Sequence, residues 1–532
     1  MPGLLELKGI SASQGYAEGP VFDLDRPLAA YAAKGSPEAE KTALSVAITT
    51  ASGNLAELIA AAEGEAGDIL EFQLAMIEDD ALTAPAFAAI AQGSPADIGW
   101  TMVLDAEIGG YEASDEEYFR ARAADIRDIR DQVLQALLAD SGSSVPPGAI
   151  LCGGDIAPTR FLQTDWSLGG GIALKGGSSA SHVAMLARSR GVPMVVGLGD
   201  AANGISGEAL LDAEHGVVVF APSQTERRHF KTASDAFAAR RDKAADFLGK
   251  PAVTKSGLPI RVQVNIADPT DVERIDIATC DGVGLMRTEF LFGKALPGEE
   301  SQYCAYRKVL EWAEGKPVTI RTVDAGGDKP VPGFTVEETN PFLGLRGIRL
   351  SLARSDIFRV QVRALLRAAV HGTLKVMFPM IAVPEEYARA AALFAEEAVA
   401  LAAAGVEHAM PPLGIMVEVP SVAIAPELFS DVAFFSIGSN DLTQYVMAAA
   451  RDNSTVAALN SVRNPAVLRL IGQVAAFGKA SGISVSLCGD AGGDPAAIPA
   501  LLEAGLRDLS VAPAQLAMAK AAIAELSVGG HG

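Results

Sequence analysis

Charged side chains recur directly after short apolar runs in the second half of the chain. Apolar runs followed by such residues are typical of parallel strands, whose carboxyl ends carry the active site in α/β proteins. The residues concerned lie in MRTE at 286–289, RTVD at 321–324, VEV at 417–419, SND at 439–441 and CGD at 488–490. Arg346 lies within a further segment, NPFLGLRGIR at 340–349. We therefore expect arginines, carboxylates and one thiol to meet at one rim.

Those residue types favour the chemistry of phosphorylated acids. Arginine guanidinium groups hold carboxylate and phosphate oxygens in two-point contacts. Two carboxylates with few soft ligands nearby suit a Mg²⁺ ion that bridges to a substrate phosphate. A lone thiol at a strand end is a candidate proton donor. The alternative is that these charges form only structural ion pairs, because a barrel rim is polar in any case.

A second candidate centre lies at 176–188, where the sequence reads GGSSASHVAMLAR. Its Gly- and Ser-rich loop brings His182 to the start of an apolar-periodic helix, where loop amides and the positive helix end favour an anion. Neutral imidazole is nucleophilic at physiological pH, so His182 is a candidate phosphoryl acceptor. The alternative is a surface or capping histidine. The other histidines lack such a setting and are expected to be structural or exposed: His215, His229, His371, His408 and His531.

The elements that position these residues follow from the hydrophobic pattern. From residue 251 onward, strand-like runs alternate with helical stretches, at 260–266, 282–285, 318–321, 374–378, 413–417, 433–437, 483–487 and 509–511. Eight such units over 251–528 match the ~250 residues that are typical of a (β/α)₈ barrel.

The first part of the chain has a different texture. Residues 36–140 are rich in Ala, Leu and Glu and predict helices. Short apolar runs between Gly-rich turns follow, which predict a compact α/β domain. The first twenty-odd residues share that texture, so the helical block is expected to be an insertion within the α/β domain. The charged stretch 223–248 predicts a connecting helix. The predicted fold class is therefore a multidomain α/β protein with an inserted helical bundle, a connecting helix and a C-terminal (β/α)₈ barrel.

Composition excludes several classes of protein. The chain has 532 residues and a formal net charge of −22, which argues against a nucleic-acid partner. No apolar run approaches the ~18 residues that cross a bilayer, so no membrane insertion is expected. The start, MPGLLELKG, does not read as a secretory signal. The cysteines are scattered, which suits a reducing, cytoplasmic location: Cys152, Cys280, Cys304 and Cys488.

Taken together, seven segments in order along the chain resemble a known family. They are SHVAMLAR around His182, GVGLMRTEFLF at 282–292, IRTVDAGGDK at 320–329, NPFLGLRGIR, GIMVEVPS, FFSIGSNDLTQY and LCGDAGGD. The chain resembles Enzyme I of the bacterial phosphoenolpyruvate:sugar phosphotransferase system over nearly its whole length.

This resemblance implies an activity and partners. The barrel would bind phosphoenolpyruvate, and His182 would take its phosphoryl group, leaving pyruvate. His182 would pass the group to a histidine of the carrier protein HPr, which starts the sugar phosphotransferase cascade. The family forms a homodimer through its barrel, and a homodimer is expected here.

The resemblance also implies a role for each site residue. The clamps for phosphate and carboxylate would be Arg287, Arg321 and Arg346. The Mg²⁺ ligands would be Glu418 and Asp441, and further substrate contacts would come from Asn440 and Arg451. Cys488 would protonate the enolate carbon to give pyruvate.

Domain boundaries follow from the same resemblance. The phosphohistidine α/β domain would comprise residues 1–30 and 145–222, and the inserted helical domain that docks the carrier would comprise 31–144. A linker helix at 223–250 would lead to the phosphoenolpyruvate-binding barrel at 251–532.

The sequence departs from the family pattern at a few positions. The family's active loop usually reads GG-x-T-S-H, whereas this chain has Ser178 for the second Gly and Ala180 for Thr. Ala450 stands where the family tends to have an acidic residue before Arg451. Two alternatives stay open: a regulatory, nitrogen-type Enzyme I, and an ATP-dependent relative such as pyruvate phosphate dikinase or phosphoenolpyruvate synthase.

Overall fold

The computed structural model describes most of the chain. The described residues are 5–26, 30–61, 65–112, 117–138, 145–177, 181–292, 296–327, 331–336, 338–450, 456 and 459–527. They form two compact units, Met1–Asp235 and Ala236–Gly532.

The N-terminal unit is built on one mixed, eight-stranded sheet with the order β1-β8-β7-β3-β4-β5-β6-β2. Its strands are β1 (Leu5–Lys8), β2 (Ile10–Ser13), β3 (Tyr16–Asp23), β4 (Ile150–Gly153), β5 (Gly171–Leu174), β6 (Met194–Val196), β7 (Glu208–Asp212) and β8 (Val217–Phe220). Neighbouring strands β3, β4, β5 and β6 are parallel, and the remaining pairs are antiparallel. Side chains alternate between two buried layers: Leu151 packs in one layer, and Ile150 and Cys152 pack in the other.

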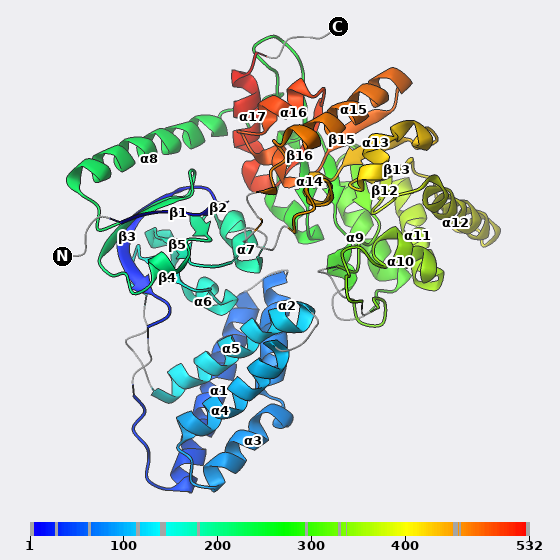
Figure 1. The fold of residues 1–532 in the computed structure, drawn as a ribbon. Helices are drawn as coiled ribbons and strands as arrows, with labels where there is room; N and C mark the ends of the chain where they lie inside the picture. The colour runs from blue at the N-terminus through cyan, green and yellow to red at the C-terminus, as the bar shows by residue number, and fades with distance from the viewer. Residues whose placement is uncertain are drawn as a thin grey trace. The chain divides into compact units, whose positions relative to one another are not determined.

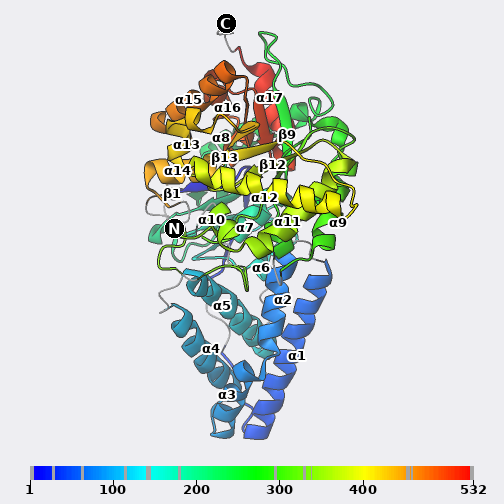
Figure 2. The same ribbon diagram turned by 90° about the vertical axis from the view of Figure 1, so that its right-hand side faces the viewer.

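A block of helices separates β3 from β4 in the sequence, although the two strands are hydrogen-bonded neighbours. The helices are α1 (Pro37–Ala61), α2 (Glu65–Ile77), α3 (Asp80–Ala91), α4 (Ala96–Glu112) and α5 (Glu117–Leu138). They run alongside one another as a bundle with its own core (Figures 1 and 2). The fully buried Trp100 donates its indole N–H to the Arg130 carbonyl at 3.1 Å. The helical block is therefore an insertion in the α/β sheet, as the sequence predicts.

The described residues of the N-terminal unit also include the helices α6 (Pro158–Gln163) and α7 (His182–Arg190), and the long α8 (Gln224–Ala245) begins in this unit and ends in the second. Helix α7 begins after Ser181, whose hydroxyl accepts the Ala184 N–H at 3.2 Å, and ends at Gly191 in the left-handed conformation. Helix α8 matches the connecting helix predicted at 223–248.

The second unit contains a closed barrel of eight parallel strands, and each predicted run is one of them. The strands are β9 (Arg261–Ile266), β10 (Val283–Met286), β11 (Val318–Arg321), β12 (Leu374–Phe378), β13 (Leu413–Val417), β14 (Phe434–Ile437), β15 (Ser484–Leu487) and β16 (Asp508–Val511). Strand β16 pairs with β9, which closes the barrel. The predicted fold class is confirmed.

Helices surround this barrel (Figure 1). They are α9 (Glu299–Trp312), α10 (Ile348–Ala353), α11 (Ser355–Ala368), α12 (Pro384–Ala403), α13 (Pro420–Ile424), α14 (Ser439–Met447), α15 (Pro465–Ser481), α16 (Ile498–Glu503) and α17 (Leu516–Glu525). The connection from β9 to β10 differs from a regular βα unit, because it consists of the short 3₁₀ helices η4 (Pro269–Arg274) and η5 (Ile277–Thr279).

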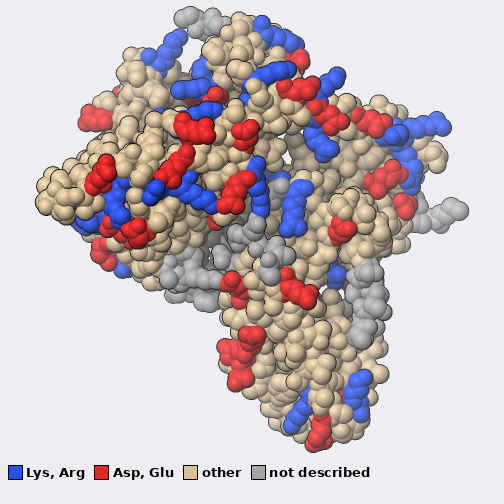
Figure 3. All heavy atoms as spheres, turned by 180° about the vertical axis from the view of Figure 1, so that it is seen from behind, with Lys and Arg blue, Asp and Glu red and all other residues tan. Residues whose placement is uncertain are grey.

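The surface carries both signs of charge. On the face in Figure 3, red and blue side chains are interspersed over the molecule. Within the described residues, no helix is both long enough and apolar enough to cross a membrane.

Candidate functional site

The carboxyl ends of the barrel strands bring most of the predicted residues to one rim. Arg321 is the last residue of β11, and Glu418 follows β13 directly. Asp441 lies in the first turn of α14, which begins two residues after β14. Arg287 follows β10 and Cys488 follows β15. Parallel strands end at the same edge of a barrel, so this placement follows from the fold.

Two buried arginines share one carboxylate at this rim. Oδ2 of Asp324 lies 3.2 Å from Nη1 of Arg321 and 3.0 Å from Nη2 of Arg346. Arg321 also reaches Oε1 of Glu289 at 3.0 Å, and the same oxygen accepts the Asp324 N–H at 2.9 Å. Burial by itself lowers the pKa of Arg321, but Glu289, Asp324 and Glu418 outweigh it and raise that pKa above its usual value. Both guanidinium groups therefore stay charged.

Arg346 is held from several sides. Its Nη1 donates to the Tyr445 hydroxyl at 3.2 Å, and that hydroxyl donates to the Phe342 carbonyl at 2.7 Å. Oδ2 of Asp441 lies 3.7 Å from Nη2 of Arg346. Within the described part of the chain, Nε of Arg346 and Nε of Arg321 are buried without a hydrogen-bond partner. Each arginine therefore has donor capacity that the surrounding protein leaves unused.

The Glu418 carboxylate is held by the backbone N–H of Met380, a residue with an unusual backbone conformation. Its Oε1 accepts the Met380 N–H at 2.6 Å, and Met380 has a φ of 58°, in the left-handed region that a non-glycine residue rarely adopts. Burial, together with Asp441 and Asp324, raises the pKa of Glu418 to about 8, although Arg321 and Arg346 lower it. The carboxylates of Glu418, Asp441 and Asp324 therefore lie near one another in a buried part of the rim.

These carboxylates suit a hard divalent cation. Glu418 and Asp441 offer oxygen donors, and Oδ1 of Asp441 is buried without a hydrogen-bond partner among the described residues. In that part of the chain, no group of three or more His, Cys, Asp or Glu side chains is arranged to hold a metal by itself. Mg²⁺ typically takes one or two protein carboxylates and completes its shell with water and substrate oxygens. The residues present therefore fit Mg²⁺.

Cys488 carries a buried thiol and follows β15 directly. Its side chain is buried with Leu285, Met377, Met416 and Phe434 inside the barrel, and its Sγ lies 3.6 Å from the Ile437 carbonyl oxygen. Burial raises its pKa to about 11, although Arg321 and Arg287 lower it. The thiol therefore keeps its proton at neutral pH and can donate it.

Asn440 lies in the first turn of α14, and its role in substrate binding stays a prediction. It forms a reciprocal pair with Asp490: its Nδ2 donates to Oδ2 at 3.0 Å, and its Oδ1 accepts the Asp490 N–H at 3.1 Å. This pair joins the first turn of α14 to the 3₁₀ helix η10 (Asp490–Gly493), which follows β15. Arg451 lies outside the described residues.

The second centre is described up to the edge of its loop. Ser181 caps α7, and the backbone of His182 opens that helix. Lys175, at the end of β5, contacts Oδ2 of Asp25 at 2.6 Å, and the same carboxylate accepts the Gly154 N–H. The side chain of His182 and the loop residues 178–180 lie outside the described part, and the predictions for Ser178 and Ala180 stay predictions.

Most of the chain matches the domains of one group of enzymes. A model described as "PEP-utilising enzyme, PEP-binding domain" matches residues 241–528. Models for the N-terminal and mobile domains of PEP-utilising enzymes match 8–122 and 145–216. The chain is 37% identical to a phosphoenolpyruvate-protein phosphotransferase of Priestia megaterium, over 98% of this chain and 94% of that one. The chain belongs to the phosphoenolpyruvate-protein phosphotransferase family.

Other phosphoenolpyruvate-protein phosphotransferases are similarly close. The Bacillus subtilis (strain 168) protein is 37% identical over 98% of this chain and 95% of its own. The Geobacillus stearothermophilus protein is 40% identical over 79% of this chain and 74% of its own. The predicted enzyme class, a transferase, is thereby confirmed, and these relatives do not favour the nitrogen-type alternative.

The fold brings several further residues of this phosphotransferase to the rim. Glu289 and Asp324 stand in strand-end segments that were noted, but neither was assigned a role; their place after β10 and β11 was the available signal. Met380 and Tyr445 carried no comparable signal, because each acts through a backbone group or a hydroxyl on a neighbouring loop or helix.

Three of the remaining histidines are held in local contacts elsewhere. Nδ1 of His215 lies 2.9 Å from Oδ2 of Asp212, Nε2 of His371 lies 2.8 Å from the Tyr303 hydroxyl, and Nδ1 of His408 lies 2.8 Å from the Val406 carbonyl. His229 is exposed, and His531 lies outside the described residues.

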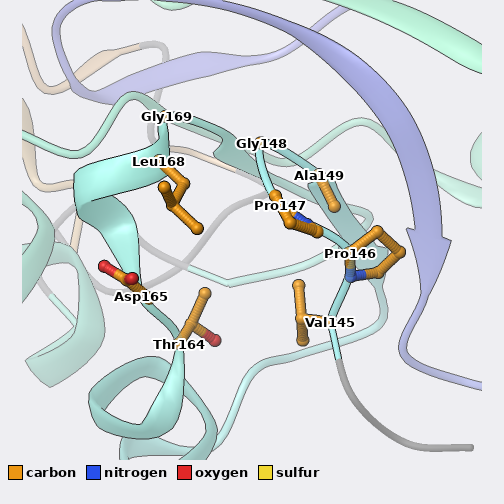
Figure 4. A pocket seen from close by; sticks show the side chains of 9 residues that line it. All are labelled: Val145, Pro146, Pro147, Gly148, Ala149, Thr164, Asp165, Leu168 and Gly169. Carbon is orange, nitrogen blue, oxygen red and sulfur yellow. The ribbon is translucent and has the colours of Figure 1, made fainter.

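A small pocket in the N-terminal unit holds none of the predicted site residues. It is lined by Val145, Pro146, Pro147, Gly148, Ala149, Thr164, Asp165, Leu168 and Gly169 (Figure 4). The Asp165 carboxylate points away from the hollow and accepts the Ser167 N–H at 3.0 Å. This pocket therefore offers little to an anionic substrate.

Proposed function

We propose that this phosphotransferase binds phosphoenolpyruvate at the barrel rim and transfers its phosphoryl group to His182. The observation that carries the proposal is the buried Arg321–Asp324–Arg346 arrangement, in which two charged guanidinium groups keep unused donors beside two carboxylates. Guanidinium groups of this kind neutralise phosphate and carboxylate oxygens. Arg287, Asn440 and Arg451 would add substrate contacts.

Glu418 and Asp441 would hold Mg²⁺ at this rim. The bound ion would supply positive charge to the oxygens of the transferred phosphate. The two carboxylates would hold the ion, and each is itself held by the fold: Glu418 accepts the Met380 N–H, and Asp441 lies at the start of α14. Phosphoryl transfer depends mainly on such positioning and charge neutralisation.

The reaction would then proceed in two steps. An imidazole nitrogen of His182 attacks the phosphorus, and the bond between phosphorus and the enol oxygen breaks, which leaves the enolate of pyruvate. The Cys488 thiol gives its proton to C3, the C2 oxygen becomes a ketone, and pyruvate forms. Solvent returns a proton to the thiolate.

The phosphoryl group would leave His182 for a histidine of the carrier protein HPr and so enter sugar transport. We propose the same domain division as the sequence predicts: 1–30 and 145–222 for the phosphohistidine domain, 31–144 for carrier docking, 223–250 for the linker and 251–532 for the barrel. We also propose a homodimer formed through the barrel. The carrier that accepts the group separates this function from a regulatory, nitrogen-type relay.

A nucleotide-free phosphorylation assay tests the proposal. The protein is incubated with ³²P-phosphoenolpyruvate and Mg²⁺, and the label is examined for the acid lability and base stability of phosphohistidine. We expect label on the wild type and on His215→Ala, the matched histidine control, and none on His182→Ala. Label that appears only when ATP is supplied would assign the chain to the dikinase side. No label under either condition would overturn the proposal.

A further inference from the structure

Asn265 makes a hydrogen bond to the backbone of Cys488, the proposed proton donor. It lies on β9, and its Nδ2 donates to the carbonyl oxygen of Cys488 at 3.1 Å. Strand β16 lies between β9 and β15 in the barrel, so this amide reaches past one strand to the loop after the next. The bond joins residues that are 223 positions apart in the sequence.

The Asn265 amide is itself held in one orientation. The Ser510 hydroxyl, on the intervening strand β16, donates to Oδ1 of Asn265 at 2.6 Å. Because Oδ1 accepts this bond, Nδ2 must face the Cys488 carbonyl. Ser510 is fully buried, and a Cβ at Gly284 would lie 2.4 Å from its Cβ, so the glycine leaves the space that Ser510 occupies.

The Cys488 backbone is fixed from its other sides as well. Its N–H donates to the Ile437 carbonyl at 3.0 Å. A Cβ at the following Gly489 would lie 1.9 Å from Oγ of Ser439, so this peptide packs closely against the start of α14. Because β15 ends at Leu487, the Cys488 carbonyl lies beyond the strand ladder, and the Asn265 side chain supplies its donor.

We infer that Asn265, oriented by Ser510, is a positioning residue that holds the Cys488 peptide so that the thiol delivers its proton to one face of the substrate. Rotation of this peptide would move Sγ, because the side chain and the carbonyl leave the same Cα. This inference rests on the proposed role of Cys488. It assigns Asn265 to the protonation step and not to phosphoryl transfer.

The step itself needs no further reactant. The thiol S–H bond breaks, the electron pair of the enolate C=C bond forms the new C–H bond at C3, and the negatively charged C2 oxygen becomes the pyruvate ketone. An enol that leaves the site before protonation is protonated in water on both faces. The configuration of the new methyl group therefore reports where the proton came from.

The test uses phosphoenolpyruvate with one deuterium of defined geometry at C3, in tritiated water, so that pyruvate carries a chiral methyl group. We expect one configuration from the wild type and a largely racemic methyl group from Cys488→Ala. Asn265→Ala and Ser510→Ala should lose much of the configuration and form pyruvate roughly 10²-fold more slowly. Labelling by ³²P-phosphoenolpyruvate should stay close to wild type. Ser486→Ala, the same change on β15 at a hydroxyl that donates to the Phe435 carbonyl, should keep one configuration.

Several outcomes would overturn the inference. If Asn265→Ala raises KM for phosphoenolpyruvate and keeps one configuration, Asn265 contacts the substrate instead of positioning the thiol. If Cys488→Ala gives a racemic product while Asn265→Ala and Ser510→Ala behave as wild type, only the positioning role is wrong. If Cys488→Ala keeps one configuration, the thiol is not the donor, and both roles are wrong. Thermal midpoints identify any variant that fails to fold; if Asn265→Ala fails, Ser510→Ala carries the test, and if Ser510→Ala fails, Asn265→Ala carries it.

Discussion

Arg346 and Asp324 form a buried ion pair in which Nη2 lies 3.0 Å from Oδ2, and their side chains are 2% and 1% exposed. The same carboxylate oxygen also contacts Arg321. Among the described residues, Nε of each arginine has no hydrogen-bond partner, so both guanidinium groups keep a donor that a phosphate could use. The same ion pairs should therefore stabilise the folded rim and orient the two arginines toward a substrate.

Asp324→Asn should lower both the free energy of unfolding and the rate of phosphorylation. Removing one partner of a buried ion pair leaves a buried charge without compensation, so the free energy of unfolding should fall by about 3–5 kcal/mol. The rate of phosphorylation at low phosphoenolpyruvate should fall roughly 10²-fold, because the arginines lose their orientation. Denaturant unfolding and ³²P labelling measure the two effects. Asp356→Asn, at an exposed pair with Arg354, is the control and should leave the free energy of unfolding nearly unchanged.

Glu418→Gln should increase the Mg²⁺ concentration needed for phosphorylation. A neutral amide keeps the size of the side chain but loses the charge that attracts the ion, so the half-saturating Mg²⁺ concentration should rise at least about ten-fold. Labelling rates over a Mg²⁺ titration, with EDTA as the zero point, measure this shift. Glu397→Gln, a buried carboxylate of α12 that pairs with Arg359, is the control. An unchanged Mg²⁺ requirement in Glu418→Gln would contradict the ligand assignment.

Two changes at Ser181 should separate the capping of α7 from its charge. Ser181→Ala removes the bond to the Ala184 N–H and should lower the free energy of unfolding by about 1 kcal/mol. Ser181→Asp keeps a capping oxygen but adds a negative charge beside His182, so phosphorylation should slow roughly ten-fold with stability preserved. The same change at Ser36, ahead of α1, should leave labelling unaffected. Equal labelling rates in Ser181→Asp and wild type would contradict this expectation.

Asp128 should make the N-terminal unit less stable as the pH rises. This carboxyl lies on α5 and accepts the Thr159 hydroxyl of α6 at 2.7 Å and the Gln73 amide of α2 at 3.1 Å. Burial raises its pKa from the usual 3.8 to about 6, although both hydrogen bonds lower it. Because the folded state binds this proton more tightly, its stabilising contribution is complete below the usual pKa and is lost as the pH rises through 6.

Asp128→Asn should remove this pH dependence. The variant should match the wild type near pH 4 and exceed its free energy of unfolding by about 3 kcal/mol at pH 7, since the Asn side chain needs no ionisation. Denaturant unfolding at several pH values measures the difference. Asp131→Asn, a partly exposed neighbour, serves as the control. A constant difference between Asp128→Asn and wild type at all pH values would show that the carboxyl does not titrate as expected.

The barrel and most of its rim were predictable because their signals are local. Each strand is a short apolar run bounded by glycine, proline or polar residues, and the side chain after each run must lie at one end of a parallel barrel. Arg321, Glu418 and Cys488 were identified on this basis. The β9–β10 connection was less predictable, because short 3₁₀ helices have no long amphipathic period.

Contacts between distant segments were decided only by the tertiary structure. Nothing in the sequence indicates that Asp324 joins two arginines, or that Met380 adopts a left-handed conformation to donate its N–H to Glu418. The bond from Asn265 to Cys488 depends on β9 closing the barrel against β16. By itself the sequence determined the types of residue at the rim and the strands that carry them. The ion pairs and hydrogen bonds among those residues depend on closure of the barrel. Only closure brings segments that are hundreds of residues apart within hydrogen-bond distance.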